Sequence, residues 1–277
     1  MTPYYDDGIV TLYCADVAGL DVPALGLAGT SAVVTSPPYN VALGYDADPT
    51  GDALEWPTYR QLAATVAVLM AAALVPGGRA WVNTAVSVPA HPGSPSGEGK
   101  RRVLLGHLWA TALSDAGLSL VDQVSWQSVR GPGTAWGSWE SPAAPNLRGD
   151  HELITVASNG PWERRPPAGF DAWRDRVGGW HALCSTVWNV CTVGRNGRGA
   201  DRRGHPAPFP VELARRCIRL STWPGEVVCD PFAGTGSTLL AARQLGRRAI
   251  GVERSERYCA LAVDRLAQGA LDLGGAA

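Results

Sequence analysis

The sequence predicts an α/β fold with a doubly wound, mostly parallel sheet, and three observations support this. Short β-branched runs alternate with stretches whose apolar residues recur at helical spacing. Two of the runs, Ala32-Val33-Val34 and Val227-Val228-Cys229, lead directly into segments rich in proline or glycine. Between these two regions the alternation breaks down for about 78 residues, as an inserted irregular region would require. Ligands bind at the carboxyl ends of strands in such sheets, so the two segments are the first candidates for a site.

The first part of the chain alternates strands and helices. Strands are expected at 9–13, 32–35, 79–83 and 118–126, and helices at 57–74 and 103–115. Residues 40–57 are polar and lack an apolar period, which predicts a loop over the mouth of the site. Residues 89–101 hold three Pro and three Gly, which predicts a second loop.

Regular order returns near the end of the chain. Helices are expected at 210–221, 237–245 and 256–267 and strands at 226–230 and 247–253, followed by a frayed tail from Gln268. Seven of the eleven Trp fall between Trp126 and Trp188, so this stretch differs in composition from the α/β regions on either side of it. We therefore divide the chain into one half of a single α/β domain (1–126), an inserted region (127–204) and the second half of the domain (205–277).

Composition narrows the class of protein. The chain has 277 residues, 45% of them hydrophobic and 18% charged, and no apolar run of the roughly 18 residues that a membrane span needs. The start of the chain lacks the basic and apolar regions of a signal peptide, so a cytoplasmic location is expected. The six Cys form no C-x-x-C pair, which argues against a zinc site or a disulfide framework. We expect no metal.

The net charge of −1 conceals an uneven distribution. Residues 1–120 carry five basic and ten acidic side chains, whereas residues 121–277 carry nineteen basic and fifteen acidic ones. All of the 24 basic residues except Lys100 are Arg, which suits contacts to phosphate or guanine, although GC-rich codon usage produces the same bias. The second half is therefore the expected nucleic-acid side.

The segment Asp230-Pro231-Phe232-Ala233-Gly234-Thr235-Gly236-Ser237 has the features of a nucleotide-cofactor turn. Gly234 and Gly236 allow close backbone approach, and the following helix N-terminus offers amide donors. Glu253 ends the next strand 17 residues after Gly236, near the spacing at which a carboxylate accepts from ribose hydroxyls. No lysine completes a Walker A loop, and Leu239 occupies the third glycine position of a dinucleotide fingerprint. A simple strand-to-helix turn is the alternative.

The segment Thr35-Ser36-Pro37-Pro38-Tyr39-Asn40 suits a pocket for an exocyclic amine. The lone pair of such an amine is delocalised into its ring, and acceptors for its two hydrogens free that lone pair. The Ser36 hydroxyl and the Pro37 carbonyl are candidate acceptors, with Pro38 fixing the backbone and Tyr39 stacking on the base. A flipped base is required because the amine is unreachable inside a duplex. A rigid turn or a polyproline ligand is the alternative.

Together these segments resemble the DNA amino-methyltransferases that use S-adenosylmethionine. Thr35 to Asn40 resembles their catalytic motif and Asp230 to Ser237 their cofactor motif. Three shorter segments are similar to further family motifs: His205-Pro206-Ala207-Pro208-Phe209-Pro210, Cys14-Ala15-Asp16 and Leu74-Val75-Pro76-Gly77-Gly78. The order, catalytic motif before cofactor motif, is that of the beta class. The resemblance covers 9–126 and 205–266, and the place of residues 127–204 is where the family carries its target-recognition region.

The resemblance implies a Rossmann-like methyltransferase sheet, S-adenosyl-L-methionine as cofactor, and double-stranded DNA as partner. Ser36 at the head of the motif favours the N4 amine of cytosine, because members acting on adenine N6 usually carry Asp there. Adenine N6 methylation is the alternative activity, and a catalytically silent nucleic-acid-binding module is the non-enzyme alternative. A C5-cytosine reaction is disfavoured, since it needs a cysteine nucleophile and no Pro-Cys pair occurs. The recognised DNA word, a cognate restriction endonuclease and the oligomeric state stay open.

The candidate residues follow from these motifs. The catalytic candidates are Ser36, Pro37, Pro38 and Tyr39. The cofactor-binding candidates are Asp16, Thr35, His205, Pro206, Phe209, Pro210, Asp230, Pro231, Phe232, Ala233, Gly234, Thr235, Gly236, Ser237, Glu253 and Arg254. The DNA-binding candidates are Lys100, Arg101, Arg195, Arg198, Arg202 and Arg203.

Two weaker patterns also occur. Six arginines are candidates for guanine contacts, although a solvated surface role is the preferred interpretation for each: Arg130, Arg148, Arg164, Arg165, Arg174 and Arg176. The pair His151-Glu152 suggests an acid–base pair, but strand-edge packing is preferred because this chemistry needs no strong base.

Overall fold

The structure is a computed structural model, and it describes residues 1–20, 25–42, 52–90, 101–127, 149–170, 179–191 and 209–274. The elements of the first half are β1 (Tyr5–Asp6), β2 (Val10–Cys14), a short 3-10 helix η1 (Val17–Gly19), β3 (Thr30–Thr35), α2 (Trp56–Ala73), β4 (Leu74–Ala85), β5 (Val88–Pro89), β6 (Arg102–Val103), α3 (Leu105–Asp115) and β7 (Ser119–Gln127). The remaining elements are β8 (His151–Ser158), α4 (Trp180–Leu183), β9 (Val187–Asn189), α5 (Val211–Ser221), β10 (Val227–Asp230), α6 (Ser237–Gln244), β11 (Arg248–Glu253) and α7 (Glu256–Gly274).

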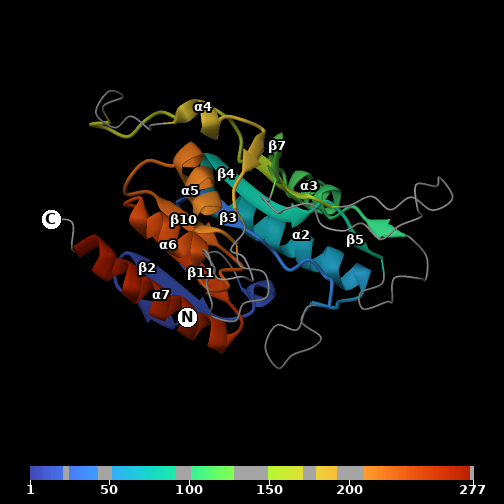
Figure 1. Ribbon diagram of the computed structural model, residues 1–277, viewed down its shortest axis with the longest axis horizontal. Coiled ribbons are helices and arrows are strands. Elements are labelled where there is room, and N and C mark those ends of the chain that lie inside the picture. Colours follow the sequence, from blue (N-terminus) through green and yellow to red (C-terminus); the bar gives the residue numbers. More distant parts are fainter. Residues whose placement is uncertain are drawn as a thin grey trace.

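Nine of these strands form one twisted sheet in the order β1-β2-β11-β10-β3-β4-β8-β7-β9 (Figure 1). The central strands β2, β11, β10, β3 and β4 are mutually parallel, whereas β8 runs antiparallel to both β4 and β7. The order reverses direction between β10 and β3, which come from opposite ends of the chain. Such a switch point is where open α/β sheets bind ligands.

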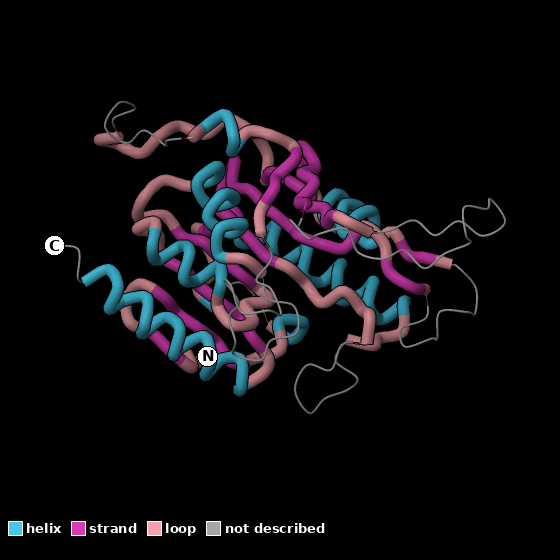
Figure 2. Tube along the Cα trace, viewed as in Figure 1, coloured by secondary structure: helices cyan, strands magenta, loops and turns pink. Residues whose placement is uncertain are grey.

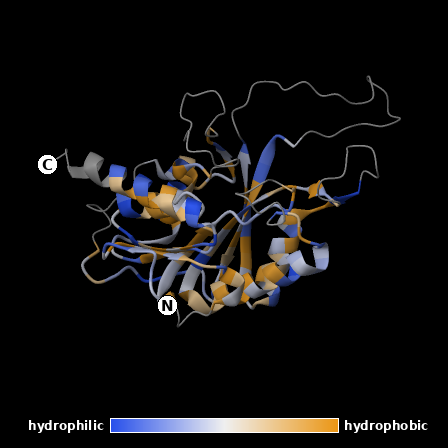
Figure 3. Ribbon diagram, turned by 90° about the horizontal axis from the view of Figure 1, so that it is seen from below, coloured by the Kyte–Doolittle hydropathy of each residue, from blue (hydrophilic) through white to orange (hydrophobic). Residues whose placement is uncertain are grey.

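Helices cover both faces of the sheet, so the fold has three layers (Figure 2). The alternation of side chains along a strand explains this: in β3, Ala32 and Val34 pack with α5, α6 and α7, whereas Val33 packs with α2 and α3. The three residues are fully buried. Hydrophobic residues accordingly concentrate along the strands and on the helix sides that meet them (Figure 3).

The observed elements match the expected ranges closely, with two local differences. The segment Leu74 to Gly78, which follows the expected helix and precedes the strand expected at 79–83, is the start of β4. Thr30 pairs with Leu74 and Ala32 already pairs with Arg79, so the intervening residues bulge out of the ladder. The chain beyond Gln268 continues α7 to Gly274 instead of fraying immediately.

Part of the expected inserted region belongs to the main sheet. β8 lies between β4 and β7 and pairs with both along most of its length, and β9 pairs with β7. The division at residues 126 and 204 stays a prediction, but the sheet includes strands from within that range. β8 consequently brings side chains close to the end of β4, next to the catalytic segment.

No helix within the described ranges is long and apolar enough to span a membrane.

Candidate active site

A hydrogen bond joins the two segments that the sequence singles out. Thr35 ends β3 and its hydroxyl donates to Oδ1 of Asp230, at the end of β10, across 2.7 Å. The same carboxylate oxygen accepts from the backbone N–H of Phe232 at 3.0 Å. Asp230 is only 4% exposed, and burial raises its pKa to about 6, although these hydrogen bonds act in the opposite direction. The buried carboxyl group therefore connects the end of β3 to the turn that follows β10.

The turn after β10 is shaped by glycine. Gly236 has a φ of +77° and caps the N-terminus of α6, and a Cβ atom there would lie 3.1 Å from the Cβ of Ala262. Arg265, from α7, donates to the carbonyl of Thr235 at 3.2 Å and to the hydroxyl of Ser237 at 3.0 Å. The turn is thereby held from the α7 side, and its backbone N–H groups and the α6 N-terminus suit an anionic or polar ligand.

Glu253 lies beside this turn at the end of β11. Its Oε2 accepts from the N–H of Gly234 and its Oε1 from the N–H of Ser255, both at 2.8 Å. Burial raises the pKa of this carboxyl. Glu253 pairs in register with Cys14 of β2, which brings the exposed Asp16, two residues further on, to the same edge. Each carboxylate oxygen keeps lone pairs for ribose hydroxyls, so the arrangement suits a nucleoside.

Side chains of α2 and α3 hold the segment Thr35 to Asn40 in place. The carbonyl of Pro38 accepts from the hydroxyl of Tyr59 at 2.5 Å, and Tyr59 in turn accepts from Nε1 of Trp109 at 3.1 Å. Asn40 has a φ of +58°, and its N–H donates to Oδ1 of the buried Asp52 at 2.6 Å. Among the described residues, nothing donates a hydrogen bond to the Pro37 carbonyl. The loop is therefore rigid while that acceptor is left for a ligand.

Four polar side chains meet at the surface of this segment. The hydroxyl of Tyr39 donates to Oε2 of Glu152 at 2.7 Å. Nδ2 of Asn83 lies 2.7 Å from both of those oxygens and 3.4 Å from the hydroxyl of Ser36. The hydroxyls of Ser36 and Tyr39 are 3.3 Å apart. Segments from β3, β4 and β8 thus contribute to one polar pocket.

Two members of this pocket, Asn83 and Glu152, were not expected. The preferred interpretation of His151-Glu152 was packing at the edge of the sheet, and it is wrong for Glu152. β8 lies inside the sheet, and the carboxylate of Glu152 accepts a hydrogen bond from Tyr39. His151 is turned to Asp150 instead, at 2.8 Å. One sequence signal could have indicated Asn83. It ends the strand expected at 79–83, just as Thr35 ends the strand expected at 32–35. The antiparallel pairing that brings Glu152 there has no local sequence signal.

The other predicted residues divide into three groups. Several lie at the carboxyl edge of the sheet or pack next to it: Pro231, Phe232, Ala233, Arg254, Phe209 and Pro210. Arg101 is exposed beside β6. The following lie outside the described residues: Lys100, Arg130, Arg148, Arg174, Arg176, Arg195, Arg198, Arg202, Arg203, His205 and Pro206.

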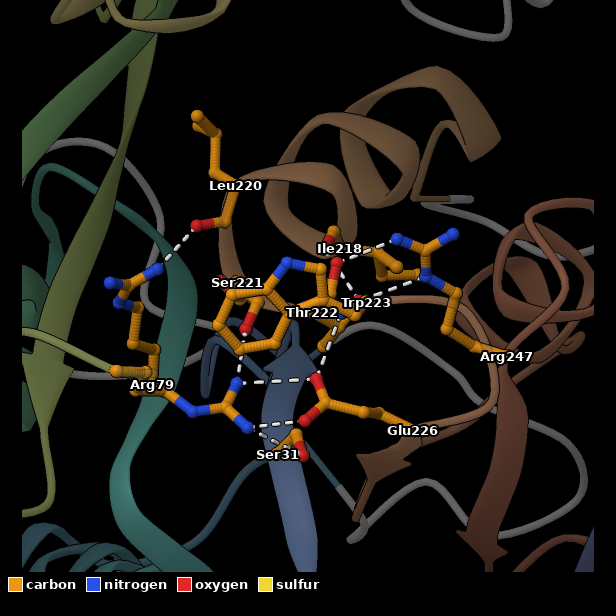
Figure 4. Close-up of polar contacts among 10 residues, drawn as sticks. Ser31, Arg79, Ile218, Leu220, Ser221, Thr222, Trp223, Glu226 and Arg247 are labelled. Carbon is orange, nitrogen blue, oxygen red and sulfur yellow. Dashed lines mark hydrogen bonds and ion pairs between the residues drawn. The ribbon is translucent and has the colours of Figure 1, made fainter. Parts of the chain in front are cut away.

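Both interpretations of Arg164, the guanine contact and the preferred solvated surface role, are wrong. Its guanidinium forms an ion pair with Glu226 and donates to the carbonyl of Ser221 at 2.8 Å and to the hydroxyl of Ser31 at 3.3 Å. Figure 4 shows Glu226 and Ser31 in this cluster, beside Arg79 and Arg247. Ser31 and Glu226 lie near the amino ends of β3 and β10, so Arg164 stabilises the edge opposite the pocket.

Within the described ranges, no group of three or more His, Cys, Asp or Glu side chains could hold a metal ion. The polar groups at the carboxyl edge are instead suited to a nucleoside cofactor and to an amine. Both candidate segments lie at the switch point of a doubly wound sheet, which is where folds of this class bind nucleotide-like cofactors.

Comparison with known proteins identifies the family. The family described as DNA methylase matches residues 30–264, and the chain belongs to it. The type II methyltransferase M.SmaI of Serratia marcescens is 30% identical over 209 residues, which cover 69% of this chain and 63% of M.SmaI. The chain thus spans less than two thirds of the length of this relative.

Solved structures agree with this assignment. TTHA0409 of Thermus thermophilus, in complex with S-adenosyl-L-methionine, superposes with a TM-score of 0.68 at 26% identity, covering 93% of each chain. The PvuII DNA methyltransferase (cytosine-N4-specific) superposes with a TM-score of 0.69 at 20% identity, covering 95% of this chain and 88% of its own. The predicted Rossmann-like fold and the resemblance to DNA amino-methyltransferases are confirmed.

Proposed function

We propose that this protein transfers a methyl group from S-adenosyl-L-methionine to the exocyclic N4 of a cytosine flipped out of double-stranded DNA. The observation that carries the proposal is the hydrogen bond between Thr35 and Asp230, which joins the segment Thr35 to Asn40 to the glycine turn after β10. Family membership and the cofactor-bound relative support the reaction class.

The residues of the cofactor turn fit S-adenosyl-L-methionine. The half-buried Glu253 is suited to accept from the ribose hydroxyls, and Asp16, at the same edge of the sheet, is suited to lie near the adenine. The glycine turn and the α6 N-terminus face the carboxylate end of such a ligand. His205, Pro206, Phe209 and Pro210 are proposed to line its methionine end. Bound there, the cofactor supplies a sulfonium methyl group, whose leaving group is neutral after transfer.

The catalytic segment is suited to hold the target amine. The Ser36 hydroxyl and the buried Pro37 carbonyl accept its two hydrogens and draw the nitrogen toward a tetrahedral geometry. Tyr39 stacks on the flipped base while its hydroxyl is held by Glu152. The Tyr59 bond to Pro38 keeps this geometry in place before the base arrives. Catalysis is then mainly positioning and electrostatics.

Contacts to the DNA are proposed for the arginine-rich stretch Arg195, Arg198, Arg202 and Arg203 and for Lys100 and Arg101. Positive side chains among glycines suit a loop that follows a phosphate backbone. Residues 127–204 are proposed to recognise the target sequence, and a cognate restriction endonuclease is the partner to search for.

Ser36 is the residue that favours cytosine. A member acting on adenine N6 usually has Asp in its place, and a hydroxyl is found here. Incubation with isotopically labelled S-adenosyl-L-methionine and mixed-sequence DNA, followed by mass spectrometry of the nucleosides, is expected to yield N4-methylcytosine. N6-methyladenine as the sole product would assign the enzyme to the adenine class. Absence of cofactor binding by calorimetry would instead indicate a silent DNA-binding module.

A further inference from the structure

Glu152 is a carboxylate in the amine pocket that the proposed methyl transfer does not yet use. Its Oε2 accepts from the hydroxyl of Tyr39 and from Nδ2 of Asn83, each at 2.7 Å. Both donors are neutral. Among the described residues, no Lys, Arg or His comes within ion-pair distance of Glu152, and its Oε1 has no hydrogen-bond partner.

The fold holds this group in place with a strand at each side. β8 pairs with β4 and with β7, and Glu152 lies opposite Ala85 on one side and Trp126 on the other. Trp126 is buried and its Nε1 donates to the carbonyl of Val190 at 2.9 Å, so that neighbour does not neutralise the carboxylate. The sheet thus fixes the Glu152 carboxylate in the pocket, where the two groups that donate to it are neutral side chains.

A second observation marks the same pocket as a ligand site. Asn83 is 1% exposed, and its Oδ1 is buried without a hydrogen-bond partner among the described residues. Its amide nitrogen is shared between Tyr39 and Glu152. Buried polar groups in a native structure normally have partners, so a side chain with one orphaned end beside an uncompensated carboxylate suits a pocket completed by substrate.

We propose that Glu152 is the acceptor of the proton that the target amine loses during methyl transfer, through the hydroxyls of Ser36 and Tyr39. The path is continuous: the Ser36 oxygen is 3.3 Å from the Tyr39 oxygen, which is 2.7 Å from Oε2 of Glu152. This assignment rests on the proposed methyl transfer to an exocyclic amine.

Bond formation and proton transfer balance within the pocket. The lone pair of the amine nitrogen forms the bond to the methyl carbon while the carbon–sulfur bond breaks, and that electron pair stays on sulfur. The nitrogen becomes positively charged and its N–H acidic, so a carboxylate is a sufficient base. The proton passes to the Ser36 oxygen, the Ser36 proton to Tyr39, and the Tyr39 proton to Glu152, which becomes a neutral acid. The methylated amine is left neutral.

The first test compares single-turnover methylation rates for the wild type, Glu152→Gln and the matched neighbour variant His151→Gln. Glu152→Gln keeps the size and one acceptor but cannot take up the proton, so its rate is expected to fall by about 100-fold or more. Cofactor affinity measured by calorimetry is expected to stay unchanged. His151→Gln, whose side chain is turned to Asp150, is expected to retain the wild-type rate.

The second test separates proton transfer from a structural role. In Glu152→Ala, added formate or acetate is expected to restore part of the rate, with acetate more effective at equal occupancy because it is the stronger base. In Tyr39→Phe/Glu152→Ala, which lacks the relay hydroxyl, neither acid is expected to restore it. A wild-type rate in Glu152→Gln, or rescue that does not follow basicity, would overturn the assignment. Absence of any methylated base with the wild type would instead refute the proposed function.

Discussion

Neutralising Asp230 is expected to stabilise the folded protein at neutral pH. The carboxyl is 4% exposed, and its pKa in the folded state is about 6, compared with 3.8 for an unperturbed carboxyl. Burial disfavours the ionised form, and the hydrogen bonds from Thr35 and Phe232 offset this only in part. In Asp230→Asn, the amide oxygen can accept both of these hydrogen bonds without carrying a charge.

The magnitude follows from the difference between the two pKa values. Well below the unperturbed pKa of 3.8 the carboxyl is protonated in both the folded and the unfolded chain, so it does not change stability there. As the pH rises through the folded pKa near 6, the unfolded chain is already ionised and the folded state is progressively disfavoured. Above that pH the full difference corresponds to about 3 kcal/mol, at about 1.4 kcal/mol for each unit.

Urea unfolding at a series of pH values between about 3 and about 8 measures this effect. Relative to the wild type, Asp230→Asn is expected to gain up to about 3 kcal/mol in free energy of unfolding at neutral pH and almost nothing near about pH 3. Glu163→Gln, which removes an exposed carboxyl, is the control and is expected to leave the pH dependence unchanged. A variant that is less stable than the wild type at neutral pH, or equally pH-dependent, would refute the reasoning.

Three further results are expected. In Gly251→Ala the new Cβ would lie 2.8 Å from the side chain of Leu239 in α6, so urea unfolding should show that the free energy of unfolding falls by about 1–3 kcal/mol. An unchanged free energy of unfolding would contradict this close packing between α6 and the sheet. Arg164→Met leaves Glu226 without its ion-pair partner and should lower the free energy of unfolding by about 3–5 kcal/mol in the same assay. Most of this loss should be regained in Arg164→Met/Glu226→Gln, and an unchanged stability of the single variant would contradict a stabilising ion pair. Glu253→Ala should weaken cofactor binding at least about tenfold by calorimetry, whereas Tyr39→Ala should abolish transfer with nearly unchanged affinity, and two fully active variants would reject both site assignments.

The sequence was sufficient for six of the nine strands of the main sheet and for both segments at its carboxyl edge, because their signals are local. The runs at 32–34 and 227–229 are rich in valine and mostly buried, and each is followed by residues with restricted or unusual backbone conformations. The turn at Gly236 has the positive φ that its glycine suggests. Elements of this kind depend on residues within about ten positions of one another.

Pairings between distant strands were not predictable in the same way. The bulge at Leu74 to Gly78 depends on how β4 aligns with β3, and the place of Glu152 depends on β8 lying between β4 and β7. Arg164 illustrates the same limit, since its partner Glu226 lies 62 residues further along the chain. Charge patterns along the chain do not reveal which arginines are used inside the fold.

The sequence alone therefore determined the class of fold and the two segments proposed to bind the cofactor and the amine, because the signal for each lies in consecutive residues. The tertiary structure decided that Thr35 and Asp230 bond to each other, and that Asn83 and Glu152 complete the pocket. These contacts arise where parallel and antiparallel strands from distant parts of the chain end at one edge of the sheet. Proximity across a sheet is set by strand order, which hydrophobic periodicity does not specify.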